Sequence, residues 1–211
     1  MKKTLALIFS LGILLLGACA SPATEAAAPP PVNEAPVEAT ETLAPTAAPT
    51  PTEVASEPVE PGLPFELIST AFEQGEAIPV QYSCDGEDIS PSLAWGDPPA
   101  GTQTLTIIMD DPDAPGGTWD HWIVFNISAD LRELPDAVSA GEVGATFGQN
   151  SWGRSDYGGP CPPSGTHRYF FKLYALDTTL NLNETANKSQ VLAAMDGHIL
   201  AETELMGTFS R

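Results

Sequence analysis

The chain has 211 residues and a formal net charge of −20 at pH 7, with 28 acidic against 8 basic side chains. A negative field of this size disfavours nucleic acid and repels anionic lipid head groups, so we expect neither as a partner. Residues 63–211 alone hold 21 acidic and 6 basic residues, so most of the acidity belongs to the part of the chain that we expect to fold.

The first residues have the pattern of an export signal. Lys2 and Lys3 supply positive charge, and the apolar run over residues 5–16 is too short to span a bilayer comfortably. A Leu-Gly-Ala-Cys sequence follows, as in bacterial lipoprotein signals, and its cysteine is Cys19. We therefore expect residues 1–18 to be cleaved and Cys19 to carry lipid on the extracytoplasmic face of a membrane. The alternative is an ordinary secretory signal with an incidental cysteine.

The segment after the signal has the composition of a linker. Residues 20–62 are dominated by Ala, Pro, Thr and Glu, and they contain no Lys, Arg or aromatic residue. Such a segment cannot bury enough apolar surface to offset its conformational entropy. We therefore predict that residues 19–62 form a lipidated cysteine and a disordered stalk, which proline stiffens and glutamate repulsion extends.

The remaining residues, 63–211, have the usual length of one domain and can bury a core. Short runs of β-branched and aromatic residues, separated by Gly and Pro, predict strands at 105–109, 121–127 and 169–176. Helical spacing of apolar residues occurs near the C-terminus, at 189–195 and 199–205. The pattern predicts an all-β, antiparallel β-sandwich with a few short peripheral helices, including these C-terminal helical segments.

Two loop segments carry most of the residue types that bind ligands. One runs from Asp110 to Pro115 and is followed by His121. The other runs from Gly158 to Tyr169 and combines three glycines and three prolines with a thiol, a histidine and an arginine. Glycine lets the backbone approach a ligand closely, and proline holds a loop in place before binding. Because each loop adjoins an apolar strand, we expect the two loops to share one pocket.

The two segments contain the motifs DPDAP…HW, at residues 111–122, and GPCPP…HRY, at residues 159–169. In this order they resemble the phosphatidylethanolamine-binding protein family, specifically its bacterial Raf kinase inhibitor-like branch. The resemblance extends from about residue 64 to residue 211 and includes YSCDGEDISP and MDGHILAE. It implies two antiparallel sheets in a Greek-key order and a small anion-binding pocket at the surface.

The resemblance also implies which residues form that pocket: Asp111, Asp113, His121, Gly159, Cys161, His167 and Tyr169. Imidazole and phenol groups can donate hydrogen bonds to a phosphate-like oxygen. We expect the two carboxylates to hold one nitrogen of each imidazole and to raise the histidine pKa toward physiological pH. At Cys161 we expect the backbone N–H to contribute more to anion binding than the thiol.

Neighbouring residues are expected to have structural roles. Strand alternation directs Arg168 away from the face that carries His167, so we interpret it as an ion-pair residue. His198 lies apart from both loops, and we expect it on the surface or in packing contacts. Trp119 and Trp122 flank the first histidine and either form a wall of the pocket or pack in the core.

Two cysteines remain beside the one assigned to lipid. Cys84 and Cys161 form either a disulfide, as is usual in exported domains, or two buried thiols. A disulfide would close a long loop and stabilise the fold by roughly 3–5 kcal/mol. No cysteine or histidine spacing is typical of zinc, so we expect no metal. Sequons for N-glycosylation occur by chance, at Asn126, Asn183 and Asn187.

The sequence favours a binding domain and not an enzyme, and it indicates no cofactor. It contains no Gly-x-Ser-x-Gly motif, no P-loop and no nucleophile in a recognised setting. The expected partner is a small molecule that bears phosphate or carboxylate. One alternative is an inhibitor that contacts an extracytoplasmic kinase or protease, as the eukaryotic relatives suggest. Another is a hydrolase that uses a metal or an aspartate–histidine acid/base pair.

Overall fold

A computed structural model describes residues 63–211 of the chain. The predicted signal peptide, the lipidated Cys19 and the linker lie outside the described residues. Within residues 63–211, none of the helices has the length and apolar character needed to cross a membrane.

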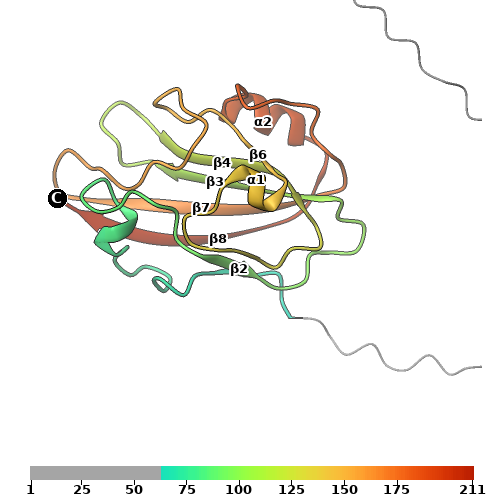
Figure 1. The fold of residues 1–211 in the computed structure, drawn as a ribbon, viewed down its shortest axis with the longest axis horizontal. Helices are drawn as coiled ribbons and strands as arrows, with labels where there is room; N and C mark the ends of the chain where they lie inside the picture. The colour runs from blue at the N-terminus through green and yellow to red at the C-terminus, as the bar shows by residue number, and fades with distance from the viewer. Residues whose placement is uncertain (1–62) are drawn as a thin grey trace, which may run out of the picture. The chain divides into compact units, whose positions relative to one another are not determined.

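Most of the regular structure is in two antiparallel sheets (Figure 1). The smaller sheet has the order β1-β2-β5, with strands at Leu67–Ile68, Leu93–Trp95 and Glu133–Leu134. The larger sheet has the order β6-β4-β3-β7-β8, with strands at Thr146–Phe147, Trp119–Ser128, Thr104–Asp111, Thr166–Leu176 and Ile199–Ser210. The helices are short: η1 at Val80–Tyr82, α1 at Ala140–Val143 and α2 at Lys188–Met195. The prediction of antiparallel sheets with few helices is confirmed, whereas the Greek-key order stays a prediction.

The main core lies between the two sheets. Side chains alternate along β3, so Ile107 and Met109 enter this core while Ile108 points to the opposite face. Trp95 and Leu134 of the smaller sheet complete the same cluster. All eight residues of β3 are buried, because both faces of the larger sheet are covered at this strand.

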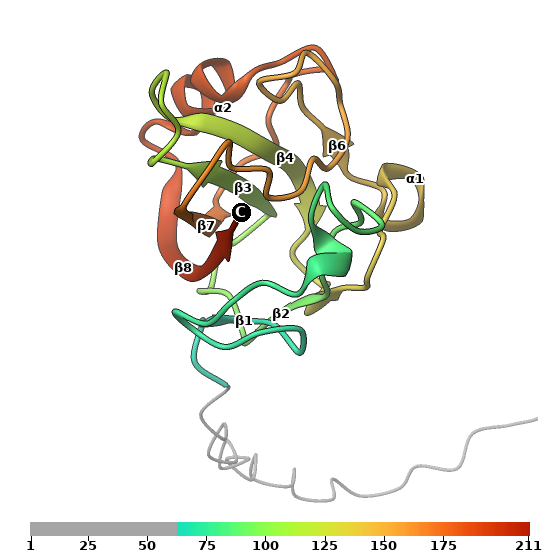
Figure 2. The same ribbon diagram turned by 90° about the vertical axis from the view of Figure 1, so that its left-hand side faces the viewer.

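A second, smaller core lies beneath α2, on the outer face of the larger sheet (Figure 2). Val191 and Met195 of the helix belong to the same buried cluster as Ile123 of β4. The helix begins at a capping box, in which Asn187 and Gln190 exchange hydrogen bonds between side chain and backbone. The predicted helix at 189–195 is therefore confirmed.

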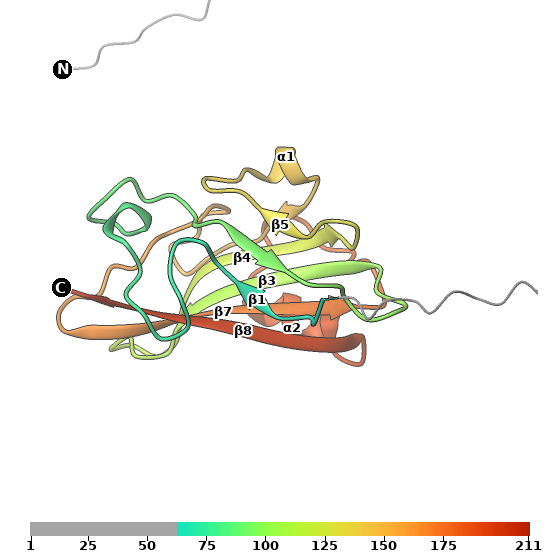
Figure 3. The same cartoon turned by 90° about the horizontal axis from the view of Figure 1, so that it is seen from below.

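The predicted helix at 199–205 is wrong, because these residues form the first half of β8. They pair with β7 in an antiparallel register that shifts once, at Leu200, and the two strands run side by side along the sheet (Figure 3). The apolar residues at 199, 200, 201 and 205 fit a helical spacing, but β7 offers a full row of backbone partners. Tertiary pairing of this kind overrides a weak local preference.

The outer edge of β8 is covered over its C-terminal half by residues 74–78. The N–H groups of Gly75 and Ile78 donate to the carbonyls of Met206 and Thr208. The N–H of Thr208 donates in turn to a carbonyl of the covering segment. These bonds occupy backbone groups that an edge strand otherwise leaves unpaired.

Candidate functional site

Three strands of the larger sheet meet at one end, where β3 ends and β4 and β7 begin. Asp111, the last residue of β3, pairs with Trp119, the first of β4. A pocket of about 540 Å³ opens at this end, and both predicted loop segments contribute to it. Its lining consists of Asp111, Ala114, Pro115, Gly116, Gly117, Thr118, Trp119, His121, Ser151, Trp152, Cys161, Pro163 and His167.

A β-bulge in β4 sets the direction of the His121 side chain. The register passes from Trp122, opposite Met109, to Asp120, opposite Asp110, so His121 has no partner across the strands. Such a bulge turns a side chain away from the regular alternation. The imidazole meets the ring of Tyr169 edge-on, with 5.2 Å between ring centroids.

The Nδ1 atom of His121 lies 2.7 Å from the carbonyl oxygen of Gly158. A carbonyl only accepts, so Nδ1 carries a hydrogen and the neutral ring has a lone pair at Nε2. Burial lowers the pKa of His121, because the imidazolium form would lose its solvation. The backbone of Gly158, the charge of Asp111 and the backbone of Gly159 oppose this shift without reversing it. The expected net rise in the pKa of His121 is therefore wrong, because burial outweighs the charge of Asp111 and the hydrogen-bond partner of the ring is a carbonyl.

The second imidazole of the pocket does have a carboxylate partner. The Nδ1 atom of His167 lies 2.7 Å from Oδ2 of Asp111, and both side chains are buried. The other carboxylate oxygen of Asp111 accepts the backbone N–H of Asp113 at 2.8 Å. Both oxygens of Asp111 are thus hydrogen-bonded, and they orient the imidazole of His167.

Tyr169 lies beneath the pocket and does not line it. Its hydroxyl is buried and has no hydrogen-bond partner among residues 63–211. Burial and the nearby charge of Asp111 raise the pKa of this phenol well above its usual value. Tyr169 is therefore a neutral donor beside His121.

Asp113 was expected in the pocket, but its carboxylate is directed at Arg168. Oδ1 accepts from Nη2 of Arg168 at 2.8 Å, and Oδ2 accepts from Nε at 2.9 Å. These hydrogen bonds lower the pKa of Asp113 to about 2. Strand alternation places Arg168 on the face opposite His167, as predicted, and the aspartate follows its partner there.

Gly159 was also expected to offer its N–H to a ligand, and the structure uses this group differently. The N–H donates to Oδ1 of Asp88 at 2.6 Å. A Cβ at this position would collide with the carbonyl oxygen of Tyr82. The glycine is therefore required for packing against the 82–88 segment, and it is not part of the pocket lining.

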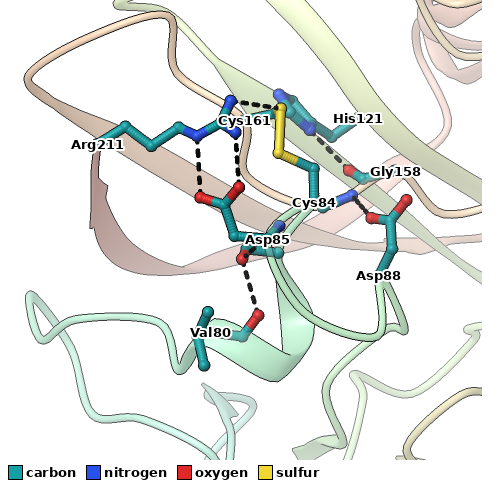
Figure 4. Close-up of a disulfide and its surroundings, with 10 residues drawn as sticks. Val80, Cys84, Asp85, Asp88, His121, Gly158, Cys161 and Arg211 are labelled. Carbon is teal, nitrogen blue, oxygen red and sulfur yellow. Dashed lines mark hydrogen bonds and ion pairs between the residues drawn. A yellow bond between two sulfur atoms is a disulfide. The ribbon is translucent and has the colours of Figure 1, made fainter.

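The structure has a disulfide between Cys84 and Cys161, which is one of the two states that the sequence left open (Figure 4). The bond joins the pocket loop to the segment that follows η1. Arg211 donates to the sulfur of Cys161 at 3.4 Å and forms a two-fold ion pair with Asp85 (Figure 4). The C-terminus, the 83–88 segment and the pocket loop are thus held together at one point.

The two tryptophans that flank His121 have different roles. Trp119 lines the pocket, whereas Trp122 is completely buried in the main core. A third residue, Trp152, was not predicted, yet its ring meets those of Trp119 at 5.4 Å and His121 at 5.0 Å. The indole packs directly against Gly158, where a Cβ would come within 2.5 Å of it and displace the ring. The only sequence signal was a large aromatic residue in a polar loop.

The remaining predicted features lie away from the pocket. His198 bonds to Asp177 at 2.8 Å on the surface. The side-chain amide of Asn126 exchanges hydrogen bonds with the backbone of Leu180. Among residues 63–211, no three side chains of His, Cys, Asp or Glu converge in a way that could hold a metal ion.

The pocket therefore combines a buried polar floor with an aromatic rim. Asp111, His121 and His167 are each less than a tenth exposed, whereas Trp119 and Trp152 are 37 % and 42 % exposed. A small polar group that enters between the indoles would reach the two imidazoles. Hydrophobic walls with a few converging polar groups are typical of small-molecule sites.

Comparison with known proteins supplies a family. The family model for phosphatidylethanolamine-binding protein matches residues 68–210. A UPF0098 protein from Methanothermobacter thermautotrophicus is 50% identical over 150 residues, which cover 70% of this chain and 99% of the relative. A UPF0098 protein from Aquifex aeolicus is 47% identical over 155 residues, which cover 71% of this chain and 91% of the relative.

Two solved structures are similar as well. One is a putative phosphatidylethanolamine-binding protein homologue from Chlamydia trachomatis, with 43% identity and a TM-score of 0.66 over 70% of this chain and 97% of that one. The other is YbcL from E. coli, described as a new member of the mammalian family, with 31% identity and a TM-score of 0.66 over 70% of this chain and 98% of that one.

Proposed function

The chain belongs to the phosphatidylethanolamine-binding protein family, and from that premise we propose that its pocket binds a small molecule bearing phosphate or carboxylate. One observation carries the proposal: His121 and His167 line the same pocket, and each ring is held through Nδ1 by an interior acceptor. Held in this way, the two rings are oriented before a ligand arrives. Orientation in advance reduces the entropy lost on binding.

We propose that the pocket binds its ligand without catalysing a reaction. Cys161 is the only thiol-derived side chain among the described lining residues, and its sulfur is committed to the disulfide. It therefore supplies no thiolate nucleophile. The hydroxyl of Ser151 accepts the N–H of Asp120 at 2.9 Å, and no imidazole activates it as a base would.

We further propose that the domain is exported and held at a membrane by lipid on Cys19. The Leu-Gly-Ala-Cys pattern at the end of the apolar run supports this location. The Cys84–Cys161 disulfide supports it independently, because such bonds persist in oxidising compartments. Metabolic labelling with a tritiated fatty acid should mark the protein, and Cys19→Ala should abolish the label. If the Cys19→Ala variant still incorporated the fatty acid, lipid attachment at Cys19 would be contradicted.

A second candidate function is inhibition of an extracytoplasmic kinase or protease by direct contact. The observation in its favour is the pair of partly exposed indoles, Trp119 and Trp152, at the pocket rim. Tryptophan is enriched among residues that dominate the energy of protein interfaces.

NMR of the histidine side chains tests the first proposal. Residues 63–211 are suitable for the experiment, because relatives that this region matches consist of little else. We expect phosphate and phosphoethanolamine to shift the signals of His121 and His167 and to leave His198 unchanged. His121→Ala and His167→Ala should each abolish the shift of the other ring. No response at millimolar ligand would contradict the pocket and favour the contact surface of the two indoles.

A further inference from the structure

The hydrogen-bond inventory of the pocket is unusual for a site that takes an anion. His121 donates from Nδ1 to a carbonyl oxygen, and His167 donates from Nδ1 to a carboxylate oxygen of Asp111. In the neutral form of each ring, the remaining nitrogen, Nε2, is therefore an acceptor. Neither Nε2 atom has a hydrogen-bond partner among the described residues, and both rings line the pocket.

No cationic side chain among the described lining residues offsets the two acceptor nitrogens. The described lining residues include no lysine or arginine. The arginines nearby are already paired: Arg168 with Asp113, Arg154 with Asp156 and Arg211 with Asp85. The buried carboxylate of Asp111 is the only lining group that is charged at neutral pH when both imidazoles are neutral.

The groups that face each imidazole can be named from every strand around it. His121 faces Asp111 of β3, Asp120 of its own strand and Tyr169 of β7, and the phenol is neutral because its pKa is raised. His167 faces Asp111, and Asp113 lies nearby with its charge balanced by Arg168. Among residues 63–211, protonation of an imidazole is thus the way to place a positive charge in the pocket without breaking an existing ion pair.

A fully deprotonated oxyanion would bring only acceptors to these acceptors. We propose that the pocket selects oxyanions that carry an ionisable proton, namely phosphate monoesters and phosphonates, and discriminates against sulfate, sulfonates and carboxylates, so that of the two ligand classes proposed above only phosphate fits. The inference rests on the proposed function, because it concerns the same pocket. A ligand O–H donates to the lone pair at Nε2, whereas sulfate has no O–H to donate at neutral pH. A site built to pair with a ligand hydroxyl rejects an analogue that lacks it.

This selection links ligand binding to the uptake of a proton. The occupied pocket holds one proton that a free dianion and a neutral His121 ring lack. A phosphate group, whose second pKa is about 6, can bring that proton with it. Sulfate must take the proton from solvent onto an imidazole, against the burial that lowers the pKa of His121.

Titration calorimetry with inorganic phosphate and sodium sulfate tests the inference on residues 63–211 without any variant. At pH 7.5 we expect phosphate to bind at least about tenfold more tightly than sulfate, since losing one hydrogen bond to a buried group has about this effect. Between pH 7 and pH 5 sulfate affinity should rise, with uptake of about one proton measured in two buffers of different ionisation enthalpy.

Equal affinities for phosphate and sulfate at pH 7.5, with heats that do not depend on the buffer, would overturn the inference and leave the anion pocket standing. Binding of neither ion at any pH would overturn the proposed function, and the inference with it.

A matched pair of variants locates the effect. His121→Gln places an amide that can donate where the neutral imidazole only accepts, so sulfate should approach the affinity of phosphate at pH 7.5. His198→Gln is the control, because this histidine bonds to Asp177 outside the pocket, and its discrimination should equal that of the unaltered protein. Retained discrimination in a folded His121→Gln variant would count against His121 as the selecting group.

Discussion

Asp110 and Asp111 are neighbours at the end of β3, and both are almost fully buried, with 2 % and 3 % of their surface exposed. Alternation puts them on opposite faces of the larger sheet. Asp110 meets two ammonium groups, at 2.9 Å from Lys172 and 2.6 Å from Lys188. Asp111 meets one imidazole, of His167, and a backbone N–H.

The different partners indicate different roles: Asp110 stabilises the fold, whereas Asp111 orients a residue of the pocket. Lys188 also bonds to Asp120 at 2.9 Å. Burial of Lys188 lowers its pKa, but the two carboxylate partners outweigh this effect, and the pKa of the lysine is raised. The Asp110 face is therefore an ionic network that closes on itself. On the Asp111 face the carboxylate has no lysine or arginine as a hydrogen-bond partner, and its partners are an imidazole that lines the pocket and a backbone N–H.

The largest expected effect comes from breaking the closed network. Asp110→Asn leaves Lys172 and Lys188 without their buried carboxylate, so the free energy of unfolding should fall by roughly 3–5 kcal/mol. Urea denaturation measures this loss. Phosphate binding by the folded variant should stay unchanged, because the pocket is on the other face. A loss below about 1 kcal/mol would contradict a structural role for the network.

The next effect concerns the covalent bond on the Asp111 face. The Cys84–Cys161 disulfide spans 77 residues of sequence, and replacing both cysteines by serine should cost about 3–5 kcal/mol. Phosphate binding should weaken as well, since Cys161 lines the pocket. Thermal unfolding with and without reductant checks the loss of stability, and titration calorimetry with phosphate checks the loss of binding. The double variant should not respond to reductant, whereas the unaltered protein should lose stability.

A smaller effect is expected for Asp111→Asn. The carboxylate offers two acceptor oxygens, one to His167 and one to the N–H of Asp113, whereas asparagine offers a single oxygen. The unmet donor should cost about 1–2 kcal/mol. Sulfate affinity at pH 7.5 should rise in this variant and stay unchanged in Asp110→Asn, which is its matched control. Equal sulfate affinities in the two variants would contradict the comparison between the faces.

The smallest effect is in the pH dependence of stability. The pKa of His121 is lowered in the folded protein from an ordinary value of 6.5, so the unfolded chain binds a proton more readily. The contribution of His121 is therefore present above pH 6.5 and is lost as the pH falls below it. The free energy of unfolding, measured between pH 7 and pH 5, should decline less steeply for His121→Gln. An identical decline would show that His121 is not the titrating group.

The fold was predictable where the chain has short β-branched and aromatic runs. The runs at 105–109, 121–127 and 169–176 lie within β3, β4 and β7, since these central strands need apolar residues on both faces. The strand β8 was missed because its first half is exposed on the outer side and its apolar residues happen to fit a helix. Its structure depends on β7, which no local pattern could reveal.

The site was predictable as a meeting of two loops, but not in its individual contacts. Asp113 turns to Arg168, and Gly159 turns to Asp88, which is 71 residues away in sequence. Trp152 carried no periodic signal, because it lies in a loop. Hydrogen bonds between distant segments placed Asp113 and Gly159, and ring contacts with Trp119 and His121 placed Trp152. Neither kind of contact can be derived from the local sequence.

The segment at 74–78 that lies along β8 has a consequence for self-association. Without it, the C-terminal half of β8 would present a row of free amide and carbonyl groups to other molecules, and such a row is a template for intermolecular strand pairing. The uncovered half carries Glu202 and Glu204, whose charges repel a second copy of the same edge. Damage to this segment would therefore be seen first as oligomers and fibrillar aggregates.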